Sequence, residues 1–221
     1  MARRVRRSVQ PASRRPISSL LAVDGAAVTS ETHADACRIS GSEACRLVLL
    51  VGEDNPLSAD PRYALYHEPA GCAGHRLQSR ILGLLPRQSY LPIWRTNLCV
   101  GGWRSDMAKD RAAVLCRPSS PWRLVVMLGV RVSDAFAEAT RVHVGPLGVG
   151  RAEPVPGTGI RLVSLPHPSG RNLLWNDRGK VGLARALLRR ACPGVPWGEL
   201  DGESRGARAA SSSGDGAGVV E

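Results

Sequence analysis

Four short apolar segments dominate the middle of this chain. They are rich in Leu and β-branched residues and have the length of buried strands, at residues 46–51, 91–98, 123–128 and 160–165. Between or after them, apolar residues recur at helical spacing, at about residues 75–84, 106–115, 133–139 and 179–191. Strands that alternate with helices predict an α/β fold, a three-layer αβα domain with a central four-stranded parallel sheet.

The two ends of the chain lack this periodicity. We expect a basic, mostly disordered N-terminal arm over residues 1–44, one folded domain over 45–200 and a disordered C-terminal tail over 201–221. The first 23 residues contain six Arg and no acidic residue. An organelle-targeting peptide has the same composition, but we favour a solvated arm.

The predicted domain is itself basic. The arm holds seven Arg and four acidic residues, and the tail holds two Arg and four acidic residues. Subtracting both from the totals of 30 and 19 leaves 21 basic and 11 acidic residues, a net charge of +10 over residues 45–200. This excess favours a polyanionic partner such as DNA. Only Lys109 and Lys180 are lysines, so a bias toward Arg codons is an equal alternative.

Membrane insertion and disulfide bonding both find little support in the sequence. The best apolar run, residues 47–51, is strand-sized and falls far short of the roughly 20 residues that a membrane-spanning helix needs. The six cysteines form no Cys-x-x-Cys pair, which indicates reduced thiols rather than a disulfide framework. We therefore expect a monomeric intracellular protein of the cytoplasm, nucleoid or nucleus, with no metal and no cofactor.

Polar residues follow the first apolar segment, and ligands of parallel sheets bind outside the carboxyl ends of the strands. The sequence GEDNP covers residues 52–56, and Tyr63 and Tyr66 come soon after it. Gly52 permits a sharp exit from a strand, and an Asp or Asn placed there can hold a water or a substrate amide. The same residue types also form an ordinary turn.

The ends of the other segments differ in their chemistry. The second ends in Thr96-Asn97, whose amide offers both a donor and an acceptor but is also a common turn former. The third leads through Gly129 into a helix and looks structural. The fourth runs into PHPSGRN, residues 166–172, where two prolines restrict the backbone around a histidine. This loop is the strongest indication of function.

Taken in order, these segments resemble the uracil-DNA glycosylase superfamily over roughly residues 46–195. The sequence HPSGRN looks like the HPSPRN motif of the single-strand-selective monofunctional uracil-DNA glycosylases, with Gly170 in place of a proline. Asn55-Pro56 looks like the Asn-Pro of the first motif in that group and in the mismatch-specific thymine/uracil glycosylases. Thr96-Asn97-Leu98 is similar to the strand segment whose Asn reads the uracil edge.

The resemblance implies a catalytic role for three residues. His167 matches the donor that stabilises the departing base as its negative charge develops. A water attacks the sugar, oriented by Asn55 or, as a rival, by Asp54. The first motif has one residue more between its Gly and its Asn-Pro than the resembling families have, so Asp54 and Asn55 cannot both keep the usual register.

The resemblance also implies residues that hold the base and the DNA. Gly52, Asn97 and either Tyr66 or Tyr63 match the base-binding positions. Such enzymes extrude a nucleotide from the helix and insert a wedge side chain in its place. The DNA-binding loop consists of Ser169, Gly170, Arg171 and Asn172, and Arg171 matches the wedge. Some relatives hold an iron–sulfur cluster on four cysteines, but Cys37 and Cys45 do not supply the usual close pair, so we expect none.

Three functions follow as hypotheses. The first is a monofunctional glycosylase that removes uracil or a related damaged base from DNA in base excision repair. The second is a non-catalytic module that binds nucleic acid or nucleotide with the same fold, and the altered first motif supports it. The third is an enzyme acting on a free nucleotide or nucleoside. The first requires that His167 and the Asp54–Asn55 pair line opposite walls of one cavity, with Asn97 at its floor.

Overall fold

A five-stranded, mostly parallel sheet forms the centre of the domain in the computed structural model, which describes residues 41–55, 60, 63–147 and 151–198. The predicted arm up to residue 40 and the predicted tail lie outside these residues. The strands are β1 (Val48–Asn55), β2 (Trp94–Val100), β3 (Leu124–Leu128), β4 (Glu153–Pro154) and β5 (Arg161–Leu165). Their order in the sheet is β2-β1-β3-β5-β4.

The sheet differs from the prediction of four parallel strands. Strands β2, β1, β3 and β5 are parallel, as expected, and β4 adds a fifth strand that pairs antiparallel with β5. With two residues, β4 is too short to produce an alternating pattern, and its Pro154 suits an edge position. Strand β1 also continues to Asn55, past the predicted end at Val51, because it keeps pairing with β2.

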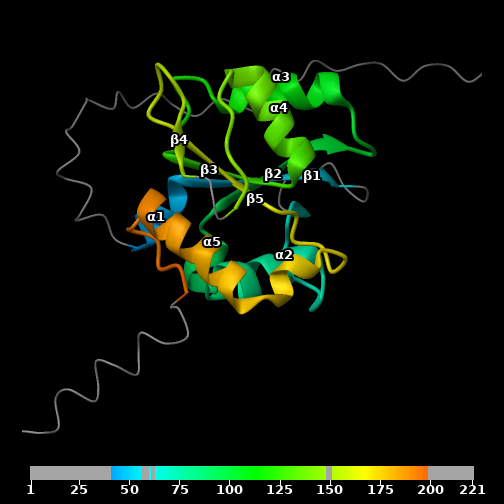
Figure 1. The fold of residues 1–221 in the computed structure, drawn as a ribbon, viewed down its shortest axis with the longest axis vertical. Coiled ribbons are helices and arrows are strands. Elements are labelled where there is room, and N and C mark those ends of the chain that lie inside the picture. The colour runs from blue at the N-terminus through cyan, green and yellow to red at the C-terminus, as the bar shows by residue number, and fades with distance from the viewer. Residues whose placement is uncertain (1–40, 56–59, 61–62, 148–150, 199–221) are drawn as a thin grey trace, which may run out of the picture. The chain divides into compact units, whose positions relative to one another are not determined.

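Helices cover both faces of this sheet (Figure 1). One layer contains α3 (Ser105–Leu115) and α4 (Val130–Thr140), and the other contains α2 (Ala73–His75), the π-helical segment η4 (Arg76–Leu82) and α5 (Arg178–Ala191). The shorter elements are α1 (Gly41–Arg46), η5 (Pro86–Tyr90) and η6 (Leu173–Asn176). We call the two sides the α3–α4 layer and the α5–η4 layer.

Strand β1 is apolar throughout its first half because its side chains point alternately into two cores, one on each face of the sheet. Val48 and Leu50 are buried in the core under the α5–η4 layer, whereas Leu49 and Val51 are buried under the α3–α4 layer. A strand buried on both faces reads as a continuous apolar run. The polar residues 52–55 continue the same strand beyond both cores, at its carboxyl end.

The predicted helices occur close to their expected positions, and helix α1 adds to them. Helix α1 begins at Gly41 and buries Ala44, so residues 41–44 are helical rather than part of the predicted arm.

None of the helices within the described ranges combines the length and the apolarity needed to cross a membrane. The five cysteines of these ranges are free thiols: Cys45, Cys72, Cys99, Cys116 and Cys192.

Candidate active site at the carboxyl ends of the parallel strands

His167 lies just beyond β5 and is half-buried. Its Nδ1 accepts a hydrogen bond from the backbone N–H of Ser169 at 3.2 Å. A neutral imidazole that accepts at Nδ1 carries its proton on Nε2. Nε2 makes no hydrogen bond to any residue that the structure describes. The loop therefore holds an imidazole whose remaining N–H is available to a ligand.

Two further side chains fix the backbone at His167. The carbonyl oxygen of His167 accepts hydrogen bonds from Nδ2 of Asn172 and Nε1 of Trp175, both at 3.1 Å. The other amide atom of Asn172, Oδ1, accepts from the N–H of Leu174 and caps η6. The structure thus uses the amide of Asn172, which the sequence nominated for DNA binding, to position the loop.

Arg76, from η4, ties the same loop to the α5–η4 layer. Its Nη1 donates to the carbonyl oxygen of Ser169 at 2.9 Å, and its Nη2 donates to the carbonyl oxygen of Asn172 at 3.2 Å. Nη2 also donates to Oδ1 of Asn176 at 2.9 Å. The sequence analysis missed Arg76, because these partners lie more than ninety positions away along the chain and no local motif marks the contact.

Glu53 is the β1 residue that approaches the histidine. A Cβ placed on Gly129, at the end of β3, would lie 2.9 Å from Oε1 of Glu53 and 3.4 Å from Cβ of His167. The Gly129 φ of 108° is itself a conformation that favours glycine. The absence of a side chain at this position therefore lets the carboxylate and the His167 loop converge. Glu53 also pairs with Arg131, at the start of α4, at 3.9 Å.

The protonation of His167 follows from these surroundings. Burial lowers the pKa of the imidazole below its ordinary value of 6.5, and the nearby Glu53 carboxylate partly opposes this shift. The lowered pKa keeps the ring neutral at pH 7. A neutral ring retains both the acceptor for Ser169 and the donor at Nε2.

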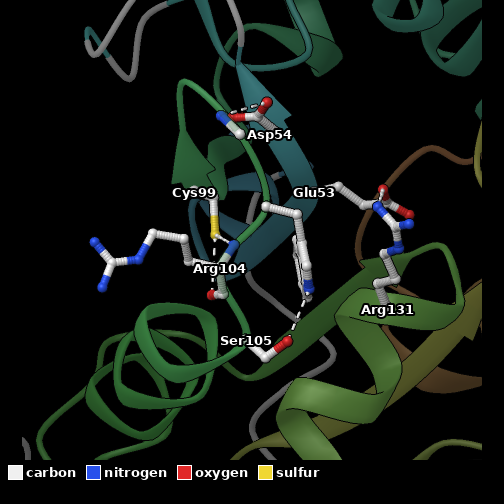
Figure 2. A network of polar contacts seen from close by, with 8 residues as sticks. Glu53, Asp54, Cys99, Arg104, Ser105 and Arg131 are labelled. Atoms are coloured by element: carbon white, nitrogen blue, oxygen red, sulfur yellow. Dashed lines mark hydrogen bonds and ion pairs between the residues drawn. The ribbon is translucent and has the colours of Figure 1, made fainter.

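Asp54 has a different role from Glu53, and Figure 2 shows the two carboxylates pointing in different directions. Oδ2 of Asp54 accepts from the backbone N–H of Gly102 at 3.1 Å, and the carbonyl oxygen of Asn55 accepts from the N–H of Gly101 at 3.4 Å. Both residues thus hold the turn that follows β2. The structure places Glu53, rather than the Asp54–Asn55 pair, beside Gly129 and His167.

Gly52 and Asn97 are paired in the register of β1 and β2. A Cβ on Gly52 would collide with Oδ1 of Asn97 and would lie 3.4 Å from Cδ2 of Leu65. The Asn97 side chain is buried, with 8 % exposure, and its amide forms no hydrogen bond within the described residues. The glycine therefore makes room for a buried amide whose hydrogen-bonding groups have no partner among the described residues.

The two candidate tyrosines have different environments. The ring of Tyr66 lies tilted against that of His67, with 4.7 Å between ring centroids, and contacts Tyr63 edge-on at 6.2 Å. Tyr63 is 59 % exposed. His67 extends this row of rings to the buried Tyr90. Tyr66 is consequently the better-fixed ring of the two.

An open cavity of about 530 Å³ lies beside this row of rings, between η4 and η5. His67 and His75 line it together with Gln78 and Arg87. None of the residues nominated from the sequence lines it, so it is not the cavity expected between His167 and the Asp54–Asn55 pair. This cavity is therefore separate from the groups gathered around Gly129.

The tip of the His167 loop is exposed. Arg171 is exposed, and Leu173, two positions later, is 70 % exposed although it is apolar. Position 170 has room for a side chain, because a Cβ there would lie 3.7 Å from Nη1 of Arg76, which is an ordinary contact. The sequence analysis missed Leu173, which its exposure now marks as a second side chain able to contact a ligand outside the loop.

The arrangement offers a neutral N–H donor, a carboxylate and a buried amide at the ends of β5, β1 and β2. No group of three or more His, Cys, Asp or Glu side chains in the described ranges is placed to hold a metal ion. No protein-family model matches the chain, and no curated protein matches it.

Proposed function

We propose that the chain is a DNA glycosylase that hydrolyses the N-glycosidic bond of uracil or a related damaged base. The observation that carries the proposal is the convergence at Gly129 of a neutral His167, with a free Nε2–H, and the carboxylate of Glu53. The proposal includes membership of the uracil-DNA glycosylase superfamily, a role in base excision repair, a monomeric state and an intracellular location.

The chemistry of base release needs both groups. As the bond breaks, negative charge develops on a carbonyl oxygen of the base and positive charge develops on the sugar. His167 donates from Nε2 to that oxygen, and its position is fixed beforehand by the hydrogen bonds of the loop. The Glu53 carboxylate stabilises the cationic sugar or orients the attacking water, whose proton it accepts.

Asn97 supplies recognition in this proposal. Its buried amide has a donor and an acceptor without partners among the described residues, which suits hydrogen bonding to the edge of a pyrimidine. Tyr66 is the candidate for stacking on the base. The nucleotide has to leave the stack to reach these groups, and Arg171 or the exposed Leu173 takes its place there.

A base-release assay tests the proposal directly. Single- and double-stranded oligonucleotides that carry one uracil are incubated with the protein and then treated with alkali, which cleaves the strand at each abasic site. We expect cleavage at the uracil position in at least one of the two substrates. A panel of modified bases extends the assay to related lesions. No cleavage of any substrate, under conditions where a control glycosylase is active, would reject the proposal.

A non-catalytic nucleic-acid-binding module is the second candidate. One observation favours it: Oδ2 of Asp54, the rival to Asn55 as the residue that orients water, accepts a hydrogen bond from the backbone of Gly102. This candidate predicts salt-dependent binding of oligonucleotides without any base release. Binding and release measured on the same labelled oligonucleotide therefore separate the two candidates.

A further inference from the structure

The two helical layers carry very different charges. Helices α3 and α4 contain three basic and four acidic residues. The helical elements of the α5–η4 layer, which are α2, η4, η5, η6 and α5, contain eight basic residues and no acidic residue, and the loop before η6 adds Arg171. The sheet thus separates a nearly neutral side from a strongly basic one. The positive charge of the domain is concentrated rather than spread over its surface.

Some cations of the α5–η4 layer have a structural role. Arg185 donates from Nε to the carbonyl oxygen of Ile81 at 3.1 Å and from Nη2 to that of Arg80 at 3.0 Å. Arg189 donates from Nη2 to the carbonyl oxygen of Gly198 at 2.7 Å. These bonds tie α5 to η4 and to the segment that follows α5.

The other cations of the layer are exposed, and their side chains form neither an ion pair nor a hydrogen bond with any residue that the structure describes. We call these six residues the basic face: Arg80, Arg87, Arg171, Arg178, Lys180 and Arg190. Some exposed cations elsewhere in the domain have acidic partners, as in the Arg104–Asp106 pair at 2.9 Å and the Arg131–Glu53 pair at 3.9 Å. Others, such as Lys109, Arg117 and Arg141, are exposed and form no ion pair with a described residue, but they do not lie among as many neighbouring cations of one layer. The basic face is therefore an uncompensated positive surface.

Part of the basic face lies next to the candidate active site. Arg171 belongs to the His167 loop, and Arg178 begins the helix that follows that loop. Arg76 binds the loop from η4, and Arg80 lies one turn further along η4. A strand whose target base reaches His167 would pass this surface with its adjoining nucleotides.

We propose that the basic face binds the sugar–phosphate backbone of the nucleic acid that flanks the target nucleotide. The inference rests on the proposed function for the position of the strand and adds the surface on which the strand docks. The 14 residues of α5 span about 20 Å at roughly 1.5 Å per residue, which is enough to contact several phosphates. Five of the six residues are Arg, whose planar guanidinium donates two parallel hydrogen bonds to a phosphate.

Two matched triple variants test the proposal. The first, Arg178→Gln with Lys180→Gln and Arg190→Gln, removes three charges from the basic face. The second, Lys109→Gln with Arg117→Gln and Arg141→Gln, removes three exposed charges from within or just after the helices of the other layer. Binding of a labelled single-stranded oligonucleotide without uracil is followed by fluorescence anisotropy over a range of NaCl concentrations.

We expect only the first variant to weaken binding, by about tenfold or more at low salt. The slope of log affinity against log salt should fall by about 2, because each lost phosphate contact contributes roughly 0.7 on a single strand. Equal losses in both variants would indicate a general effect of net charge and overturn the proposal, as would unchanged binding in the first variant or no binding by the wild-type chain.

Two further measurements complete the test: binding of the variants to lipid vesicles, and base release from an oligonucleotide. If the first variant loses binding to phosphatidylserine vesicles but keeps oligonucleotide binding, the basic face docks on acidic membranes and the proposal is wrong. Base release from a uracil oligonucleotide is scored separately. Absent release with a large difference between the two variants would reject the glycosylase and leave the docking surface in place.

Discussion

The ends of β5 and β1 meet at Gly129, but they hold their functional groups in different ways. The His167 loop is fixed by side chains from three places, since Arg76, Asn172 and Trp175 all donate to its backbone. Glu53 lies in the last part of β1, and its carboxylate pairs with the exposed Arg131 at 3.9 Å. The end of β5 therefore presents an N–H donor that several hydrogen bonds hold in place. The end of β1 presents a carboxylate that is held by a single long ion pair.

Removing the fixed donor should have the largest effect. His167→Ala deletes the N–H that stabilises the departing base in the proposed reaction, and the loss of one such donor typically lowers the rate by about 10²–10³-fold. The rate of base release from a uracil oligonucleotide measures this effect. His143→Ala, which removes an exposed histidine, is the control and should retain wild-type activity. An unchanged rate in His167→Ala would exclude this residue from the mechanism.

The two carboxylates at the end of β1 should differ strongly. Glu53→Gln keeps the size of the side chain and removes the charge beside His167, so we expect base release to fall by about 10²-fold. Asp54→Asn retains an oxygen that can accept from Gly102 and should remain within a few fold of wild type. A larger loss in Asp54→Asn than in Glu53→Gln would return the catalytic role to the residue that the sequence nominated.

The same contrast explains what the sequence could predict. The His167 loop is a local motif, so its position after the last parallel strand could be predicted from residues 160–172 alone. The choice among Glu53, Asp54 and Asn55 depends on how far β1 continues and on which side each residue faces, and the strand pairs with β2 as far as Asn55. An apolar pattern ends where the core ends, at Val51, so it cannot show this continuation. The role of Arg76 depends on contacts between distant parts of the chain, so no local sequence motif marks this residue.

Weakening the support of the His167 loop should have a smaller effect. Arg76→Ala removes the hydrogen bonds to Ser169, Asn172 and Asn176, so the imidazole is held less firmly. We expect base release to fall on the order of tenfold, since displacing a catalytic group by about 1 Å can cost up to 10²-fold. Arg76→Lys keeps the charge but loses the forked geometry and should recover only part of the activity. Full recovery in Arg76→Lys would show that charge, rather than positioning, is what this residue contributes.

The dependence on pH should show the smallest but most specific effect, because it links the two strand ends. Burial lowers the pKa of His167 below 6.5, so the ring stays neutral above pH 6.5 and takes up a proton only at lower pH. Protonation removes the Nδ1 acceptor for the Ser169 N–H and places a charge in a half-buried site. We therefore expect activity to be constant above pH 6.5 and to fall on an acid limb whose midpoint lies below that value. The unfolded chain has the ordinary histidine pKa, so the contribution of this group to stability is also present above pH 6.5 and is lost as the pH falls through the lower folded-state pKa.

Burial has the larger influence on the position of that limb, and the Glu53 carboxylate partly opposes it by stabilising the protonated imidazole. Glu53→Gln should therefore move the pKa of His167 further down, which an NMR titration of the ring protons measures without any need for activity. Asp54→Asn is the matched comparison and should leave the titration where it is, since its carboxylate is turned toward Gly102. Equal shifts in the two variants would mean that the carboxylates of β1 act on His167 alike, and the distinction between them would fail. A downward shift in Glu53→Gln alone would instead show that the end of β1 controls the charge state of the group that the end of β5 holds in place.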